Sequence, residues 1–185
     1  MSQDTGNITL GSGRLYINDV EVGYLKGDVE FKYTREKLPF KPSGSLGPVI
    51  SYVIGEEAIL SAAIAEFKIA NLKLAMGVST ALSSFSGTPS YNPASFDSTA
   101  ILHDVLTFGG SLSIVSTLAI RFEHERPGSE GTVVIVLYTA ESLSDLALAF
   151  HDEDFNMTNV SFRGLANTAR PVGDQIGMVI VEHQT

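Results

Sequence analysis

The chain has 185 residues, of which 44% are hydrophobic, 17 are glycine, 7 are proline and none is cysteine or tryptophan. A chain of this length fits one domain with a buried core, and its hydrophobic share excludes a disordered polymer. The lack of cysteine excludes a disulfide scaffold, a thiolate metal site and a cysteine nucleophile.

The chain is acidic, because 21 Asp and Glu outweigh 12 Lys and Arg and leave a net charge of −9. This balance argues against sequence-independent binding of nucleic acid or of an anionic membrane, since both need clustered Lys and Arg. Charged residues form 18% of the chain, against roughly 25% in a typical soluble domain. The low share suggests that other subunits cover part of the surface.

No targeting signal is predicted. Residues 1–13 lack the basic and apolar regions of a signal peptide, and the most apolar stretches, 58–65 and 133–137, are too short to span a membrane. We therefore expect a cytoplasm-like compartment and no membrane partner.

The predicted elements begin with a flexible N-terminal arm over residues 1–13, followed by a single domain over residues 14–185. The domain opens with a hairpin whose strands, 14–17 and 20–24, meet at a turn at Asn18-Asp19. The second strand is predicted to bury Val20, Val22 and Tyr24. After Gly27 comes a strand with one buried and one solvated face. Its buried face is predicted to hold Val29, Phe31 and Tyr33, and its solvated face Asp28, Glu30 and Lys32.

Residues 34–50 are predicted to form a long loop, because the stretch 38–48 contains three prolines and two glycines. Three apolar side chains in this loop are expected to be exposed: Leu38, Phe40 and Leu46. A loop of this length in a compact domain usually has a function, so these residues indicate docking on another molecule. The alternative is a disordered surface loop.

The middle of the chain is predicted to hold one helix, over residues 67–76, with Ile69, Leu72 and Met76 on one face and Gly77 at its end. Residues 57–66 before it suit either a strand with two buried faces or the start of that helix. Residues 79–111 are predicted to be a loop-rich insertion. The remaining strands are expected at 112–123, 132–138, 143–150, 160–165 and 178–182. The first of them is predicted to alternate apolar with polar residues, its apolar face holding Leu112, Ile114, Leu118, Ile120 and Phe122. This order predicts a mostly-β sandwich or barrel with one flanking helix.

Two clusters of charged residues are candidates for chemistry. Residues 151–154, His-Asp-Glu-Asp, offer oxygens that suit Ca²⁺ or Mg²⁺, but adjacent residues of a turn rarely converge on one ion, so a solvated loop is favoured. In residues 123–126, Glu-His-Glu-Arg, strand geometry places His124 opposite Glu123 and Glu125, which favours a charged strand end over a catalytic dyad.

Sequence signatures of enzymes are missing. The chain has no Gly-x-Ser-x-Gly motif and no phosphate-binding loop, and its four histidines lack the spacing of metal ligands. The sequence therefore predicts a protein that is not an enzyme, with no catalytic residues, no cofactor and no metal.

Four segments together resemble the major tail tube proteins of tailed bacteriophages, which are related to the tube proteins of contractile injection machines. They are similar to the family's first hairpin, its strand-to-helix passage, its closing strand and its final glycine-containing turn. The segments are GRLYINDVEVG (13–23), AEFKIANLKLAMG (65–77), NVSFRGLAN (159–167) and PVGDQIG (171–177). Their order and spacing carry the resemblance, which spans residues 13–182.

The resemblance implies a β-sandwich-like tube fold whose subunits close into hexameric rings that stack into a hollow tube. The loop 34–50 would reach the adjacent ring, with Leu38, Phe40 and Leu46 at the contact. The tube would polymerise around a tape-measure protein, meet a tail terminator and tail-tip or baseplate proteins, and pass the genome into the host. It would assemble in the host cytoplasm and reside in the tail of the virion. Ring closure would also remove the free sheet edges of the monomer.

Asp28 and Glu30 are expected to face the lumen, because an acidic channel carries DNA without binding it tightly. The alternative places this face on the tube exterior. Other functions that fit the sequence are a tube protein of a gene transfer agent or contractile injection system and, from different classes, a small-ligand-binding β-barrel or a hydrolase that uses His151.

Overall fold

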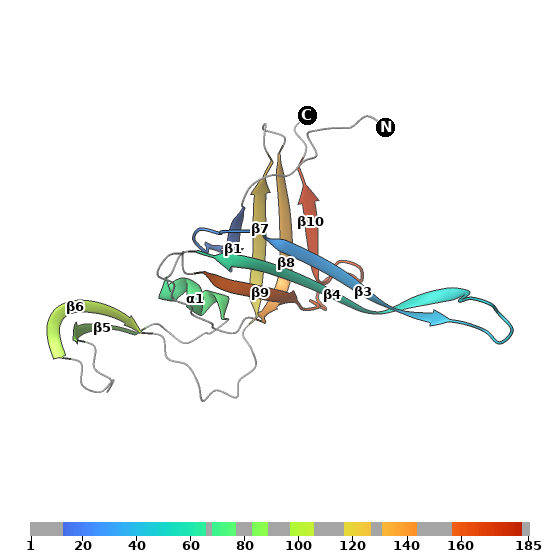
Figure 1. The fold of residues 1–185 in the computed structure, drawn as a ribbon, viewed down its shortest axis with the longest axis horizontal. Coiled ribbons are helices and arrows are strands. Elements are labelled where there is room, and N and C mark those ends of the chain that lie inside the picture. The colour runs from blue at the N-terminus through green and yellow to red at the C-terminus, as the bar shows by residue number, and fades with distance from the viewer. Residues whose placement is uncertain are drawn as a thin grey trace.

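The computed structural model describes residues 13–65, 68–76, 83–88, 97–105, 117–126, 131–143 and 157–182. Over these residues the chain is mostly β, with an eight-stranded sheet, a two-stranded sheet and one helix (Figure 1), which confirms the predicted fold class. Every strand pair in the structure is antiparallel. The elements are β1 (Arg14–Ile17), β2 (Val20–Glu21), β3 (Glu30–Phe40), β4 (Ile50–Ile64), α1 (Ile69–Ala75), β5 (Ser83–Thr88), β6 (Asp97–Val105), β7 (Leu118–Glu125), β8 (Thr132–Ser142), β9 (Thr158–Gly164) and β10 (Gly177–Val181).

The large sheet divides at β8. Its order is β2-β1-β7-β8-β9-β4-β3, and β10 also pairs with β8. Residues 133–137 of β8 pair with β10, whereas residues 140–142 pair with β9, so these two strands share the edge of β8 that faces away from β7. In Figure 1, β7, β8 and β10 run upright while β9, β4 and β3 cross them. The two parts therefore pack as layers at a large angle, as in an orthogonal sandwich.

The core lies between these layers and follows the alternation of the strands. Inward residues of β1, β4, β7, β8 and β9 form a single buried cluster, with Phe162 of β9 among its fully buried members. The predicted alternation of β7 is confirmed, because Leu118, Ile120 and Phe122 are buried. Of the two alternatives for residues 57–66, the structure has the strand, and β4 buries one face of it: Ala58, Leu60, Ala62 and Ile64.

The predicted first hairpin is confirmed. Asn18 and Asp19 both have positive φ, 51° and 63°, as the two central residues of a type I′ turn require, and Asn and Asp tolerate this conformation. The predicted buried face of its second strand is wrong. β2 ends at Glu21, so strand alternation does not continue beyond it, and Val20 and Tyr24 are exposed while Val22 is buried.

The predicted helix is confirmed as α1, and Leu72 is buried at 6% exposure. Lys73 lies in its last turn, where a cation interacts favourably with the helix dipole. Gly77, predicted to follow the helix, lies outside the described residues, as do residues 1–12, 144–156 and 183–185.

Two predicted loops contain strands. Residues 34–40 continue β3, and only residues 41–49 connect β3 to β4. Pro39 does not end the strand because β3 is at the edge of the sheet, where a missing N–H on the outer side costs no ladder bond. Within the predicted insertion 79–111, β5 and β6 pair with each other. The Ser- and Thr-rich composition of β5 is typical of loops, but its antiparallel pairing with β6 satisfies the backbone groups on the shared edge.

Candidate functional site

The far end of the β3–β4 hairpin is largely exposed. The two strands pair as far as Phe40 and Ile50, with a register shift between Glu36 and Lys37. Residues 37–54, here called the ribbon, include the part that projects from the body in Figure 1. Large apolar side chains are exposed along it: Leu38, Phe40, Leu46, Val49, Ile50, Tyr52, Val53 and Ile54. Successive strand residues point to opposite faces, so both faces of the ribbon are apolar and uncovered in the protomer.

The three residues expected to dock on another molecule all lie in the ribbon. Leu38 and Phe40 are each 56% exposed and Leu46 is fully exposed, so their predicted exposure is confirmed. The sequence prediction missed the five apolar residues at positions 49–54. A usable signal was present, because Val49-Ile50-Ser51-Tyr52-Val53-Ile54 places apolar residues on both faces of one strand next to a proline-rich turn.

Arg35 connects β3 to β4 at the root of the ribbon through an ion pair. Arg35 Nε of β3 donates a hydrogen bond to the Tyr33 hydroxyl at 3.0 Å and lies 3.1 Å from Glu56 Oε1 of β4. The guanidinium also lies 5.3 Å from the centre of the Tyr33 ring. Beyond this point the ribbon carries Lys37 and Lys41 and no acidic residue. It is therefore a basic, apolar projection on an acidic protein.

A groove of about 510 Å³ lies at the root of the ribbon and opens to solvent. One wall is made by β3 and β4, and the other by β10 and the connection from β9 to β10. Most of the lining is apolar, including Phe31, Ile54, Ile176, Met178 and Val179, and the polar side chains in it are those of Tyr33, Glu56 and Gln175.

β10 presents a free edge to this groove. Among the described residues β10 pairs only with β8. Tyr138 N donates to Ile176 O at 3.1 Å and Glu182 N donates to Thr132 O at 2.9 Å, so the even-numbered residues from 176 to 182 face β8. By strand alternation, the backbone groups of Gly177, Val179 and Val181 point away from β8. The side chains of residues 178–181 are exposed as well.

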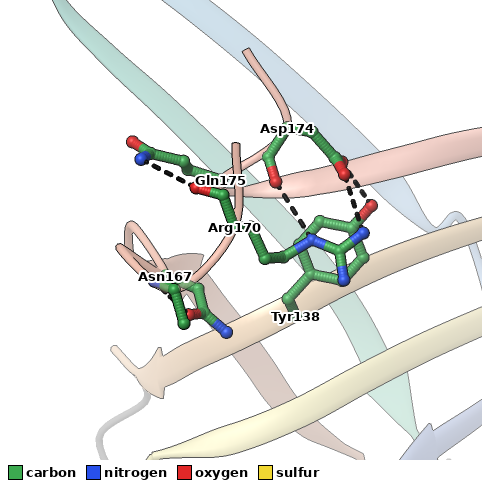
Figure 2. A network of polar contacts seen from close by, with 6 residues as sticks. Tyr138, Asn167, Arg170, Asp174 and Gln175 are labelled. Atoms are coloured by element: carbon green, nitrogen blue, oxygen red, sulfur yellow. Dashed lines mark hydrogen bonds and ion pairs between the residues drawn. The ribbon is translucent and has the colours of Figure 1, made fainter. Parts of the chain in front are cut away.

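A polar cluster fixes the connection that forms the groove wall (Figure 2). The Tyr138 hydroxyl of β8 donates to Asp174 Oδ1 at 2.6 Å, and Arg170 Nη2 donates to Asp174 Oδ2 at 2.7 Å. The Arg170 guanidinium stacks 3.7 Å from the centre of the Tyr138 ring. Gln175 Nε2 closes the cluster by donating to Arg170 O at 3.2 Å. Side chains of the connection are thereby tied to the sheet.

These contacts shift two pKa values in opposite directions. The hydrogen bond from the Tyr138 hydroxyl, followed by that from Arg170, lowers the pKa of Asp174, because both donors favour the ionised carboxylate. The hydrogen bond to Asp174, followed by burial, raises the pKa of Tyr138, because both favour the neutral phenol.

The two residues predicted to face the lumen, Asp28 and Glu30, lie at the start of β3. Glu30 is the first residue of β3 and is the Cα partner of Ser61, whereas Asp28 precedes the strand, and both are exposed. Val29 and Phe31 pack against the core, as predicted. Tyr33 is exposed instead of buried: it is the Cα partner of Ala58, and β4 pairs with β9 only from Ile59 onward, so the layer of strands ends beside it.

Of the two charged clusters, residues 123–126 lie within the described part of the chain. His124 is buried on the face of β7 that holds Phe122, while Glu125 is exposed and pairs with Arg14 at 2.7 Å. Residues 151–154 lie outside the described residues. Over the described part of the chain, no three His, Asp or Glu side chains gather as metal ligands. The one helix described there is far shorter than a membrane span.

No protein-family model matches the chain. No curated protein sequence matches it significantly.

Proposed function

We propose that this protein is a structural subunit that polymerises as stacked hexameric rings into the hollow tail tube of a bacteriophage. The observation that carries the proposal is the ribbon, a projection with apolar residues on both faces and no cover in the protomer. The resemblance of residues 13–182 to tail tube proteins supports the ring-and-tube arrangement. The mostly-β sandwich is compatible with it.

The ribbon offers enough apolar surface to drive association. Complete burial of a large aliphatic or aromatic side chain gains about 1.5–3 kcal/mol. Eight such residues lie in the ribbon, and from about half to all of each side chain remains to be buried. Their burial would gain on the order of 10 kcal/mol, which is comparable to the roughly 4–15 kcal/mol that association costs. Partner copies that cover the ribbon would therefore stabilise an assembly.

In this proposal the tube is a conduit and the protein has no catalytic role. It assembles in the host cytoplasm around a tape-measure protein, ends at a tail terminator and at tail-tip or baseplate proteins, and becomes part of the virion. DNA passes through it without tight binding, which a net charge of −9 favours. A gene transfer agent or a contractile injection system would use the same assembly.

Size-exclusion chromatography and negative-stain electron microscopy of the purified full chain test the proposal. We expect rings of six subunits and hollow tubes that lengthen with protein concentration. A monomer that persists at high concentration would contradict it.

The groove favours a second candidate function, the binding of a small apolar ligand. Its volume of about 510 Å³ lies in the range of ligand sites, roughly 300–1,000 Å³, and Tyr33, Glu56 and Gln175 supply the few polar groups that such sites use. A monomer that retains an apolar fluorescent dye in the groove would favour this function over the tube.

A further inference from the structure

We propose that the groove at the root of the ribbon receives the ribbon of a second copy of this chain, whose β4 residues 50–54 pair with the free edge of β10. This inference rests on the proposed self-assembly and names the surfaces that meet in it.

Two free strand edges are available, each at least five residues long. β4 pairs with β9 only from Ile59 to Ile64, so among the described residues the outer edge of residues 50–54 has no partner. β10 is also five residues long, and its edge away from β8 has none. Five residues span about 17 Å. Pairing the two edges satisfies backbone groups on both strands, and it places side chains of the ribbon in an apolar groove.

The edge of β4 is better suited to this pairing than the edge of β3. β3 carries Pro39 in the ribbon, and proline lacks the N–H that a ladder needs. Residues 50–54, Ile-Ser-Tyr-Val-Ile, contain no proline and are rich in β-branched and aromatic side chains, which favour strands.

A ribbon that fills the groove must come from another chain. Val53 and Ile54 of the ribbon form part of the groove wall, so the ribbon of the same protomer cannot also fill the groove. From this wall the ribbon leads away from the body, as Figure 1 shows. A second copy supplies an occupant of matching apolar character.

Charge favours the pairing of a ribbon with a body over the pairing of two ribbons. The ribbon carries Lys37 and Lys41 and no acid, so the rest of the chain is more acidic than the overall net charge of −9. Two ribbons repel each other, whereas a ribbon and the body of another copy attract.

The contact joins two different surfaces and is therefore heterologous. Each copy has one ribbon to donate and one groove to fill, so contacts of this kind propagate through rings or filaments. This is the growth that the proposed tube requires.

Intermolecular cross-linking tests the inference directly, because the chain has no cysteine of its own. Val179 directs its backbone groups away from β8, whereas those of Tyr52 face β3 and those of Ser51 and Val53 face the free edge of β4. With the two segments centred on each other, Val179 therefore lies opposite Tyr52 in a parallel ladder and opposite Ser51 or Val53 in an antiparallel one. We mix an affinity-tagged chain that carries S51C, Y52C or V53C with an untagged V179C chain, oxidise, and analyse the products on a non-reducing gel. Opposed strand residues lie at Cα distances that suit a disulfide, so we expect a heterodimer from the opposed pair. The control replaces V179C by V20C, an exposed position in β2 at the far end of the sheet. Yields from all three pairs that are no higher than this control overturn the inference.

A proline at Val179 tests the edge itself. Its N–H points away from β8, so V179P removes the outward donor and leaves the β8–β10 ladder bonds in place. We expect V179P to lose tube assembly by at least tenfold in pelleted protein, and V179T, which keeps the N–H, to retain it. Normal tubes from V179P overturn the inference. If V179P fails to fold, the cross-linking result decides.

The two proposals fail differently. Tubes in which V179C cross-links to none of the three β4 cysteines would overturn the groove contact and leave the tube function standing. A cross-link between chains that form no rings or tubes would support the groove contact and overturn the tube function.

Discussion

Asp174 joins groups from two parts of the fold through one side chain. Its two carboxylate oxygens accept hydrogen bonds from Tyr138 of β8 and from Arg170 of the β9–β10 connection. Because the same connection forms a wall of the groove, the contacts of this residue shape the surface on which assembly is proposed to depend.

The contribution of Asp174 to stability should depend on pH. The pKa of Asp174 is lowered in the folded protein, first by the hydrogen bond from Tyr138 and then by that from Arg170. Stability from such a group is fully present above its unfolded pKa of about 3.9 and is lost as the pH falls through the lower folded pKa. We expect D174N to lower Tm at neutral pH, and the difference from wild type to shrink as the pH falls below about 4.

Thermal melts between pH 7 and pH 2.5 measure this difference. D28N makes the same chemical change at an exposed residue before β3 and serves as the control. A difference between D174N and wild type that stays constant down to pH 2.5 would show that the carboxylate charge is not what stabilises the connection.

Leu72 is the buried leucine of α1, at 6% exposure, while Ala75 and the partly buried Leu74 are the residues of this helix that reach the core cluster. Leu72→Ala should lower the free energy of unfolding by about 2–5 kcal/mol, through lost burial and the cavity left behind. Leu74→Ala removes the same atoms from a partly buried position of the same helix and should cost less. Urea denaturation of the two variants gives the comparison, and equal losses would show that the deeper burial of Leu72 does not set the cost.

At the scale of elements, the sequence predicts which residues of one strand share a face, but not where other segments of the chain cover that face. Leu118, Ile120 and Phe122 predicted the buried face of β7 because one layer of the core covers all three. Tyr33 continues the alternation of Val29 and Phe31, but it is exposed because the layer of strands ends beside it, which no local pattern records.

The candidate site was predictable in part for the same reason. The proline-rich turn and the exposure of Leu38, Phe40 and Leu46 followed from the sequence. The groove did not, because its walls come from segments about 120 residues apart, Phe31 and Ile54 on one side and Ile176 and Met178 on the other. The cluster around Asp174 was missed because Tyr138 is distant in sequence.

Removing the ribbon should separate folding from stacking. Glu36 and Gly55 are Cα partners, so replacing residues 37–54 by Asn-Gly closes a shorter hairpin with a favourable type I′ turn. Because the ribbon residues are exposed and lie outside the core cluster, we expect a folded and soluble variant. We expect it to form rings but no stacked tubes, since the resemblance assigns this segment to the contact with the adjacent ring.

Circular dichroism and negative-stain microscopy test this variant. A matched control inserts Asn-Gly between Gly44 and Ser45, in the connection, and keeps both strands of the ribbon. Long tubes from the shortened variant would contradict a stacking role for the ribbon.

At the scale of the whole molecule, the acidic charge is divided unevenly. The basic ribbon projects from the protein (Figure 1). Asp28 and Glu30, in contrast, lie at the start of β3, where both are exposed. In a ring, symmetry repeats each carboxylate around the axis, and stacking repeats it along the tube. The effect of these carboxylates therefore depends on whether residues 28–30 face the lumen or the exterior of the tube.

If this face lines the lumen, the double substitution D28K and E30K should leave tube assembly intact and slow DNA ejection. An exposed charge acts alone only over about 8–10 Å at physiological salt, but repetition in a narrow channel makes the potential additive, and a basic lining would bind phosphates along the whole path. The defect should ease as salt is raised, because counterion release then contributes less to binding.

The neutral pair D28N and E30Q is the control, and it should slow ejection much less because it adds no positive charge. Ejection rates are measured from tails shown by microscopy to be well formed. Normal ejection by the lysine variant at low salt would place this face on the tube exterior, where the same carboxylates serve only solubility.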